Sequence, residues 1–335
     1  MKVSVALCTF NGTDFLAAQI TSIFGQSRLP DEVIVSDDGS ADGTVALVRT
    51  LWETLGKSHG GPEITLRTIE NVRPLGVTAN FEQAISMCTG DLIALCDQDD
   101  IWHPNRLEVA CRVFVRRPHV MLVHANARVV GQAGQYLGYT LFDALQVSEG
   151  DVAAINEGNS LEVFTRRNLA TGAATMIRRE LADMSLPFPQ EWVHDEWLAI
   201  MASVLGAVEV VTEPLIDYRQ HAGNQIGVKR PTLSVKIRRV LEPRDERNRG
   251  IWHRSSVLLA RLRSMGSAIP SDAITHLDSK VEHDRIRANL ADARLARIRA
   301  VLREGRTGRY ARYSSRGNAD ILRDLFQPAH DKNRK

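Results

Sequence analysis

The first hundred residues alternate between short apolar runs and segments in which apolar residues recur at every third or fourth position. The apolar runs predict strands at residues 2–8, 32–35, 64–69 and 92–96. Helical spacing predicts helices at residues 14–24, 42–51, 77–87 and 104–115. Strands and helices that alternate at this spacing predict an α/β fold, in which helices flank a mainly parallel, Rossmann-like sheet.

Polar residues follow each of the four predicted strands, in clusters at 9–11, 37–40, 71–73 and 97–100. The carboxyl ends of parallel strands lie along one rim of the sheet, and α/β proteins bind ligands at this rim, at a topological switch point. We therefore expect the four clusters to form one site.

The densest cluster is Asp97-Gln98-Asp99-Asp100. Carboxylates this close repel one another unless a cation lies among them, and oxygen ligands favour Mg²⁺ or Mn²⁺. Taken alone, the segment fits an Asx-rich turn that caps the next helix equally well. For Asp100 we expect the helix cap, and Gln98 has no predicted role.

The pattern is less regular after residue 120. Glycine-rich loops are expected at 131–138, and residues 141–167 form a long excursion, expected to be a lid or an acceptor loop. A strand is predicted at 171–177, a helix at 197–205 and a further strand at 207–211. The polar segment 217–221 follows that strand.

Charge divides the chain. Residues 1–228 contain 16 Lys and Arg against 28 Asp and Glu, whereas residues 229–335 contain 26 against 12, and the whole chain has a net charge of +2. We therefore expect one domain at 1–228 and a basic, mainly helical region at 229–335.

One long helix at 279–304 is predicted in this basic region. Its apolar residues recur every three or four positions, and its arginines occupy the remaining, solvated face; the apolar residues are Ala288, Ala291, Leu295, Ile298 and Leu302, and the arginines are Arg287, Arg294, Arg297, Arg299 and Arg303. Docking on the domain at 1–228 or on a second subunit of a homo-oligomer is the favoured interpretation. Adsorption to an anionic membrane surface comes second. Nucleic-acid binding is disfavoured, because few aromatic residues lie among the arginines.

The four cysteines (Cys8, Cys88, Cys96 and Cys111) have no metal-ligand spacing and lie mostly in apolar runs, as expected of core residues in a reducing compartment. No apolar span of eighteen residues and no basic leader is evident. A cytoplasmic location is therefore expected.

Six sequence blocks occur in the order found in one enzyme family. They are CTFNG (8–12), VSDDGSADGT (35–44), LGVTANFEQAI (75–85), CDQDDIWHPNRL (96–107), WVHDEW (192–197) and DYRQHAGNQIG (217–227). As an ensemble over residues 1–228, the chain resembles the family-2 glycosyltransferases, which adopt the GT-A fold. The variants QDDIW, HDEW and YRQH resemble the rhamnosyltransferase-like subgroup of surface-polysaccharide synthesis.

The resemblance implies a nucleotide-diphospho-sugar donor with a uracil or thymine base, and a glycan or lipid-linked acceptor. The implied donor-binding residues are Thr9, Asn11, Asp37, Asp38, Arg73, Asn80, Asp97 and Arg219. Asp97 and Asp99 form a DxD-like pair that would hold a divalent metal, and His221 is a third candidate ligand. For Thr9, Asp37 and Asp38, strand-end capping and turn formation are alternative roles.

The same resemblance points to Asp195 as the general base that takes the proton from the acceptor hydroxyl, with Glu196 as its competitor. His194 occupies the place of the usual first glutamate in this block. Attack opposite the leaving diphosphate would invert the anomeric centre. Helix N-capping is the alternative role for Asp195.

Two other functions fit parts of the pattern. A sugar-nucleotidyltransferase would need a glycine-rich, basic phosphate loop after the first strand, and CTFNGTD has one glycine and no lysine. A non-catalytic sugar-binding or membrane scaffold of the same fold would lack the metal pair or the base, and both are present here.

Overall fold

The computed structural model describes residues 1–221 and 247–328, which form two compact units. The N-terminal unit comprises residues 1–160 and 169–221. The C-terminal unit comprises residues 161–168 and 247–328.

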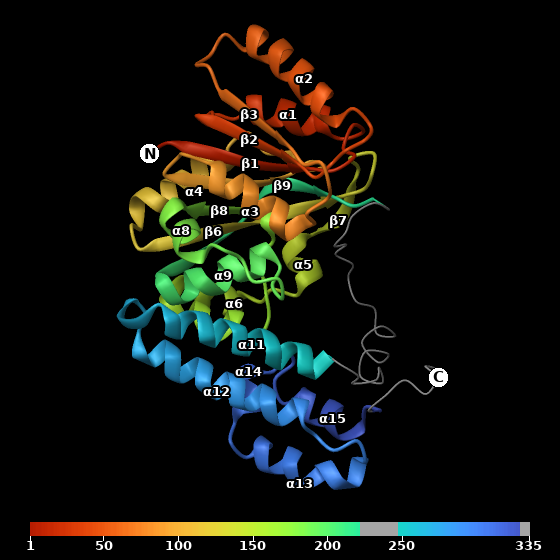
Figure 1. The fold of residues 1–335 in the computed structure, drawn as a ribbon, viewed down its shortest axis with the longest axis vertical. Helices are drawn as coiled ribbons and strands as arrows, with labels where there is room; N and C mark the ends of the chain where they lie inside the picture. Colours follow the sequence, from red (N-terminus) through yellow and green to blue (C-terminus); the bar gives the residue numbers. More distant parts are fainter. Residues whose placement is uncertain (222–246, 329–335) are drawn as a thin grey trace. The chain divides into compact units, whose positions relative to one another are not determined.

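Four parallel strands form one half of the sheet of the N-terminal unit (Figure 1). They are β1 (Val3–Thr9), β2 (Glu32–Asp37), β3 (Thr65–Glu70) and β4 (Leu92–Asp97), in the order β3-β2-β1-β4. Thr9 pairs with Asp37 and Cys8 pairs with Asp97, so the polar residues that follow these strands meet at one rim. The four predicted strands are confirmed, as is the α/β fold class.

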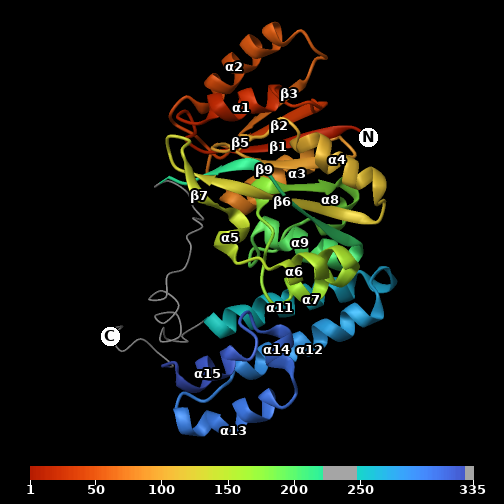
Figure 2. The same cartoon turned by 180° about the vertical axis from the view of Figure 1, so that it is seen from behind.

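The other half of the sheet is mixed. Beyond β4 come β8 (Thr175–Arg178), β6 (Val120–Val130), β9 (Ala207–Arg219) and the short β5 (Ile101–Trp102), while β7 (Tyr136–Thr140) pairs with β6 (Figure 2). The glycine-rich loop expected at 131–138 is confirmed up to residue 135, as the turn of a hairpin, and residues 136–138 already belong to β7. The predicted end of the last strand is wrong. The last strand continues past residue 211, because β9 resumes pairing with β6 after register shifts near Asn126.

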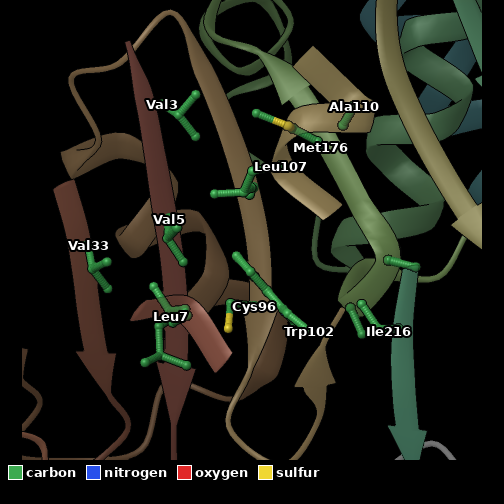
Figure 3. Packing of buried hydrophobic residues seen from close by; sticks show 14 of the residues in the cluster. Val3, Val5, Leu7, Val33, Cys96, Trp102, Leu107, Ala110, Met176 and Ile216 are labelled. Atoms are coloured by element: carbon green, nitrogen blue, oxygen red, sulfur yellow. The ribbon is translucent and has the colours of Figure 1, made fainter. Parts of the chain in front are cut away.

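Helices cover both faces of this sheet. On one face lie α1 (Leu16–Phe24), α2 (Thr44–His59) and α4 (Arg106–Arg116), whose buried apolar residues share one core cluster with the alternate residues Val3, Val5 and Leu7 of β1. Figure 3 shows Leu107 and Ala110 of α4 among the residues of this cluster. The helices α3 (Val77–Met87), α8 (Arg179–Ser185) and α9 (His194–Leu205) belong to the other face, where α3 contacts β1 and β2. Ser4, Ala6 and Cys8 point to that side, and all three are buried.

Residues 141–167, expected to be a lid or acceptor loop, are mostly helical. They form α5 (Leu141–Leu145), α6 (Glu149–Ala154), a π-helical segment (Ile155–Asn159) and α7 (Ser160–Phe164). Thr140 and Ser148 each begin a helix with a capping box, in which Asp143 and Asp151 return the hydrogen bond. These two sequence signals were overlooked in the prediction.

The C-terminal unit contains α11 (Arg247–Ser264), α12 (Ser271–Ala288), α13 (Arg294–Gly305), α14 (Arg309–Tyr313) and α15 (Ala319–Phe326). The predicted single helix at 279–304 is wrong. The structure has two helices there, since α12 ends at Ala288 and α13 begins at Arg294. Asn289 is the C-cap residue of α12, and Leu290 packs in a small core with Val301 and Tyr310.

Charged side chains form much of the interior of this unit. Arg287 donates to both oxygens of Asp324, at 2.6 and 3.1 Å, and to Asp320 at 3.4 Å. Lys280 pairs with Asp284, and His283 pairs with Glu304. We call these seven residues the buried polar network. Arg287 and Arg297, expected on the solvated face, are both buried.

Among the described residues, no helix combines the length and the apolar character that crossing a membrane would require.

Candidate functional site

The loop after β1 is tied to the loop after β2. The Thr9 hydroxyl donates to Asp37 Oδ2 at 2.7 Å. Asn11 adopts the left-handed region at φ 46°, which asparagine tolerates. Its backbone N–H donates to Ser40 Oγ at 2.8 Å, and its Oδ1 accepts from Ala41 N at 3.0 Å. The predicted residues Thr9, Asn11 and Asp37 therefore lie together at the rim.

The two neighbouring carboxylates of this rim hold different loops. Asp37 accepts hydrogen bonds from the backbone N–H of Ser40 at 2.8 Å and from its hydroxyl at 2.6 Å, which stabilises the turn after β2. Asp38 accepts from Leu75 N at 2.6 Å and from Gly76 N at 3.0 Å, so its carboxylate fixes the entry to α3. Both side chains lie at the rim and both organise backbone there.

Asn80 and Arg73 occupy contrasting environments on the same side of the site. Asn80 is buried, and its amide donates to Ser36 O at 2.9 Å while its Oδ1 accepts from the Ser36 hydroxyl at 2.6 Å. It therefore holds α3 against β2. Arg73 is exposed and makes no ion pair within the described part of the chain. Its charge is available to an anionic ligand.

Three aspartates, at 97, 99 and 100, lie at the carboxyl end of β4 and influence one another. Burial, and next the negative charges of Asp99 and Asp195, raise the pKa of Asp97 to about 7. Burial and the charges of Asp99 and Asp97 also raise the pKa of Asp100 well above its ordinary value. Asp195 comes from α9, about a hundred residues further along the chain, so four carboxylates from distant segments share one electrostatic environment.

His221 lies beside this cluster. Its Nε2 is 2.7 Å from Asp99 Oδ2, and both side chains are largely buried. The Phe15 ring stacks on the imidazole with the ring centroids 4.4 Å apart. The structure thus brings Asp99 and His221 together, as two residues that could hold one cation.

Arg219 stabilises the backbone of the same loop. Its Nε donates to Asp99 O at 2.8 Å, and its Nη1 donates to Gln132 O at 2.7 Å. Its backbone N–H donates to Asp100 Oδ1 at 3.0 Å. The expectation that Asp100 caps the next helix is wrong, because α4 begins at Arg106 with Asn105 at its N-cap, and Asp100 binds β9 instead.

The side chains of the aspartate cluster are of the chemical type that binds a divalent cation. Asp97, Asp99 and Asp100 offer carboxylate oxygens, the ligands that Mg²⁺ and Mn²⁺ prefer. Asp100 Oδ2 is buried and has no hydrogen-bond partner in the described part of the chain. Over the same residues, however, no three His, Cys, Asp or Glu side chains are already arranged as a metal site. The chemistry is suitable, and the ligand set is not preassembled.

Asp195 and Glu196 lie in the first turn of α9. Asp195 Oδ2 accepts from Gly172 N at 3.1 Å, and Oδ1 accepts from Glu196 N at 2.6 Å. Val193, and not Asp195, is the N-cap residue of α9. His194 is buried and stacks on Phe81 with centroids 4.0 Å apart, and burial lowers its pKa to about 3. His194 is therefore a neutral packing residue.

Three residues of this site had no predicted role. Gln98 bonds twice to Phe10, Phe15 packs against His221, and Gly172 holds Asp195 through its N–H. Gly172 also leaves room for His194, since a Cβ on residue 172 would lie 2.7 Å from His194 Nε2. The position of Gln98 inside the aspartate cluster was the one sequence signal that could have identified any of them.

Comparisons with solved structures identify the fold. The S. aureus TarS fragment 1–349, solved with UDP-GlcNAc, superposes with a TM-score of 0.56 at 15% identity, covering 97% of this chain and 89% of that chain. The mannosyltransferase PcManGT of Pyrobaculum calidifontis, solved with GDP-Man and Mn²⁺, gives 0.50 at 20% identity, covering 92% and 74%. At these identities the likeness shows the fold alone, which is the predicted GT-A fold.

Sequence relatives point the same way. An uncharacterized glycosyltransferase of Nostoc sp. is 24% identical over 238 residues, which cover 67% of this chain and 66% of that protein. The putative glycosyltransferase EpsE of Bacillus subtilis is 32% identical over 133 residues, 40% of this chain and 45% of that protein. The chain thus spans about two thirds or less of the length of these relatives.

The family model described as "Glycosyl transferase family 2" matches residues 4–183, which is more than half of the chain. That range contains the carboxyl ends of β1, β2, β3 and β4, and with them the polar residues of the rim and the aspartate cluster. The chain belongs to glycosyl transferase family 2.

Proposed function

We propose that this enzyme transfers a sugar from a dTDP- or UDP-sugar to a hydroxyl of a growing surface glycan and inverts the anomeric centre. The resemblance to the rhamnosyltransferase-like subgroup suggests rhamnose as the sugar. The observation that carries the proposal is the gathering of Asp97, Asp99, Asp100 and Asp195 at one place, where burial and the charges of Asp99 and Asp195 raise the pKa of Asp97, and burial and the charges of Asp99 and Asp97 raise the pKa of Asp100. Concentrated negative charge of this kind suits a site where a cation and a departing diphosphate meet.

For the donor, we assign the nucleotide to the side of the rim formed by Thr9, Asn11, Asp37 and Asp38. A carboxylate there suits the imide N–H of a pyrimidine, which is a hydrogen-bond donor. Asn80 would position α3 beside the donor, and the exposed guanidinium of Arg73 would meet the diphosphate. Arg219 would act through the loop it braces.

For the metal, we assign Asp99, Asp97 and His221 as the residues that would hold Mg²⁺ or Mn²⁺. When bound, the cation would supply Lewis-acid stabilisation of the leaving diphosphate. The His221–Asp99 contact orients both side chains beforehand, and Phe15 keeps the imidazole in place from one side.

For the base, we assign Asp195. The N–H groups of Gly172 and Glu196 orient its carboxylate at the start of α9, and a carboxylate held in this way is a suitable group to take the proton of the acceptor hydroxyl. The acceptor oxygen then forms its bond to the anomeric carbon as the bond to the diphosphate breaks, on the opposite face. Glu196, in the same helical turn, is the alternative base.

The decisive experiment compares two conservative variants. Asp195→Asn is expected to lower sugar transfer by about a hundred- to ten-thousand-fold, which is the contribution of a general base, while nucleotide affinity stays within about two-fold. Glu196→Gln is the matched control and should keep most of the activity. The reverse result would transfer the role to Glu196. The donor is found first by thermal stabilisation with a panel of nucleotide-sugars and Mn²⁺, because binding to the folded state raises its melting temperature.

We further propose that residues 1–228 are the catalytic domain, and that residues 229–335 hold the enzyme at the cytoplasmic face of an anionic membrane, next to a lipid-linked acceptor. The support comes from α13, which exposes an apolar face that the C-terminal unit does not bury. Arg297, Val301 and Glu304 are buried in the C-terminal unit, whereas Leu295, Ile298 and Leu302 are exposed, Leu295 by 84%.

Charge favours a membrane as the partner of this face. Arg294, Arg299 and Arg303 of α13 and its C-cap residue Arg306 are all exposed, and the region from 229 onward has an excess of 14 positive charges. A second copy of the chain docked through the same face would bring arginines against arginines, which is unfavourable. Anionic lipid headgroups would neutralise them, while the apolar side chains enter the acyl boundary.

Vesicle co-sedimentation tests this part of the proposal. The full chain should bind phosphatidylglycerol vesicles and bind neutral phosphatidylcholine vesicles far less. Leu295→Glu with Ile298→Glu should abolish the binding, and Val115→Glu, which alters an exposed apolar residue of α4, should not. Equal binding to both kinds of vesicle would contradict the proposal. A concentration-dependent dimer that Leu295→Glu dissolves would point to a second subunit instead.

A further inference from the structure

Gln98, the one residue between Asp97 and Asp99, makes a two-point contact with the loop after β1. Its Oε1 accepts from Phe10 N at 2.8 Å, and its Nε2 donates to Phe10 O at 3.0 Å. A primary amide carries a donor and an acceptor side by side, so it can satisfy both backbone groups of one residue. An ionised carboxylate has no proton to donate to the carbonyl, and a hydroxyl would have to serve both backbone groups from a single oxygen atom.

This contact prolongs the pairing between β1 and β4. The backbone register of the two strands ends at Cys8 and Asp97. Beyond that point the strands separate into their loops, and the Gln98 side chain takes the place of a backbone partner for Phe10. The backbone groups of Phe10 would otherwise be left at an open strand end, where they would bond to water.

The loop from Phe10 to Thr13 is thus held on two sides. On one side, Ser40 and Thr44 accept hydrogen bonds from Asn11 N at 2.8 Å and Gly12 N at 2.9 Å. On the other side, Gln98 binds Phe10. The loop therefore bridges the turn after β2 and the aspartate cluster after β4, and Gln98 is the link on the aspartate side.

Gly12 supplies the space for this link. Gly12 is buried, and a Cβ at this position would lie 2.2 Å from Gln98 Oε1 and 2.6 Å from its Cδ. Those atoms belong to the end of a flexible side chain, so alanine at position 12 would displace the Gln98 amide and leave the backbone of the loop intact. Glycine at 12 and glutamine at 98 act as one unit.

We propose that Gln98 is a positioning residue that clamps the nucleotide-side loop to the metal-side loop, and that Gly12 is required because it leaves room for the clamp. The role rests on the proposed function, since it concerns how the two halves of the donor site are held in register. The clamp fixes the distance between the residues assigned to the nucleotide and the aspartates assigned to the cation. It would therefore affect donor affinity more than turnover.

The first test measures the clamp without any activity. Amide hydrogen exchange at Phe10 is expected to be at least about ten-fold faster in Gln98→Ala than in the wild type, since the loss of a hydrogen bond of about 1.4 kcal/mol corresponds to that factor. Gly12→Ala should give the same increase. Gln98→Glu keeps the acceptor and should give a smaller one. Unchanged exchange at Phe10 in Gln98→Ala would overturn the proposal.

The second test uses the free nucleotides UDP and dTDP with Mn²⁺ as probes in calorimetric titrations. Gln98→Ala and Gly12→Ala should each weaken binding about ten-fold, and the double variant should be no weaker than either single variant, because both changes remove the same contact. The donor KM should rise by a similar factor while kcat stays within about two-fold. Gly56→Ala in α2, where a Cβ meets nothing within 4 Å, is the matched control.

Additive losses in the double variant, or a fall in kcat without a change in KM, would overturn the clamp. A wild-type chain that binds neither nucleotide would contradict the proposed function, and the exchange at Phe10 would still decide whether the clamp exists.

Discussion

Replacing Arg287 by methionine should selectively destabilise the C-terminal unit. The guanidinium donates to Asp324 at 2.6 and 3.1 Å, to Asp320 at 3.4 Å and to Ser314 Oγ at 3.1 Å. Asp320 and Asp324 are both 0% exposed. Methionine fills much of the volume but removes the cation that is hydrogen-bonded to both carboxylates, and Arg247 and Arg323 remain as the nearby positive charges.

The magnitude follows from the burial. Breaking a buried pair by removing one partner costs about 3–5 kcal/mol, because the remaining charge is uncompensated. Tyr310 still donates to Asp324 Oδ2 at 2.8 Å, which places the expectation near the lower end of that range. A loss of this size is a large part of the total stability of a small unit, about 5–15 kcal/mol.

Hydrogen exchange followed by mass spectrometry in a urea series measures the free energy of unfolding of each unit separately. Peptides from α12 and α15 report on the C-terminal unit, and peptides from β1 and β4 report on the N-terminal unit. Arg263→Met is the control: Arg263 pairs with Asp278 at the surface, with both side chains about half exposed, and should cost less than about 1 kcal/mol. Equal effects of the two substitutions, or a loss below about 1 kcal/mol for Arg287→Met, would refute the reasoning.

Three further predictions concern the N-terminal unit. Burial would raise the pKa of Asp217, but hydrogen bonds from His103 and Arg128 outweigh it and lower the pKa to about 2. The ionised Asp217 therefore adds about 2 kcal/mol to the free energy of unfolding above pH 4, and this contribution is lost as the pH falls towards 2. In Asp217→Asn the free energy of unfolding should not fall in this way between pH 4 and pH 2. An unchanged dependence on pH in the variant would contradict the assignment. Gly172→Ala should reduce transfer and cost about 1–3 kcal/mol by its clash with His194, while Gly150→Ala, which meets only an ordinary contact, should do neither. Chelation with EDTA should abolish sugar transfer, and added Mn²⁺ should restore it. Asp99→Ala should raise the Mn²⁺ concentration that restores half of the activity. Full activity of Asp99→Ala without added metal would refute the metal assignment.

The sequence revealed the N-terminal half of the sheet well because its signals are local. Each of the first four strands is a continuous apolar run, and a polar cluster marks each carboxyl end, so the rim follows from the parallel arrangement. The register that joins Cys8 to Asp97 then brings the clusters together. The contact of Gln98 with Phe10 depends on side-chain geometry across two strands, which apolar periodicity does not report.

The helical character of the C-terminal unit was predicted correctly, but the buried face of α13 was not. The apolar residues Leu295, Ile298 and Leu302 were expected to form the docking face and the arginines the solvated face, but the buried positions are Arg297, Val301 and Glu304. Periodicity assumes that apolar side chains point inward. Where ion pairs fill the interior, that assumption assigns the wrong face to the helix.

The long sequence separation within the site bears on how the protein folds during synthesis. His221 meets Asp99 across 122 residues, and β8 covers the open edge of β4 only after residue 175 has been made. The strands β1 to β4, by contrast, lie within the first 97 residues. Because the N-terminal part of a chain emerges from the ribosome first, a nascent chain can form the parallel half of the sheet with one strand edge unpaired. We therefore expect this stage of synthesis to be the one at which the chain most needs chaperones.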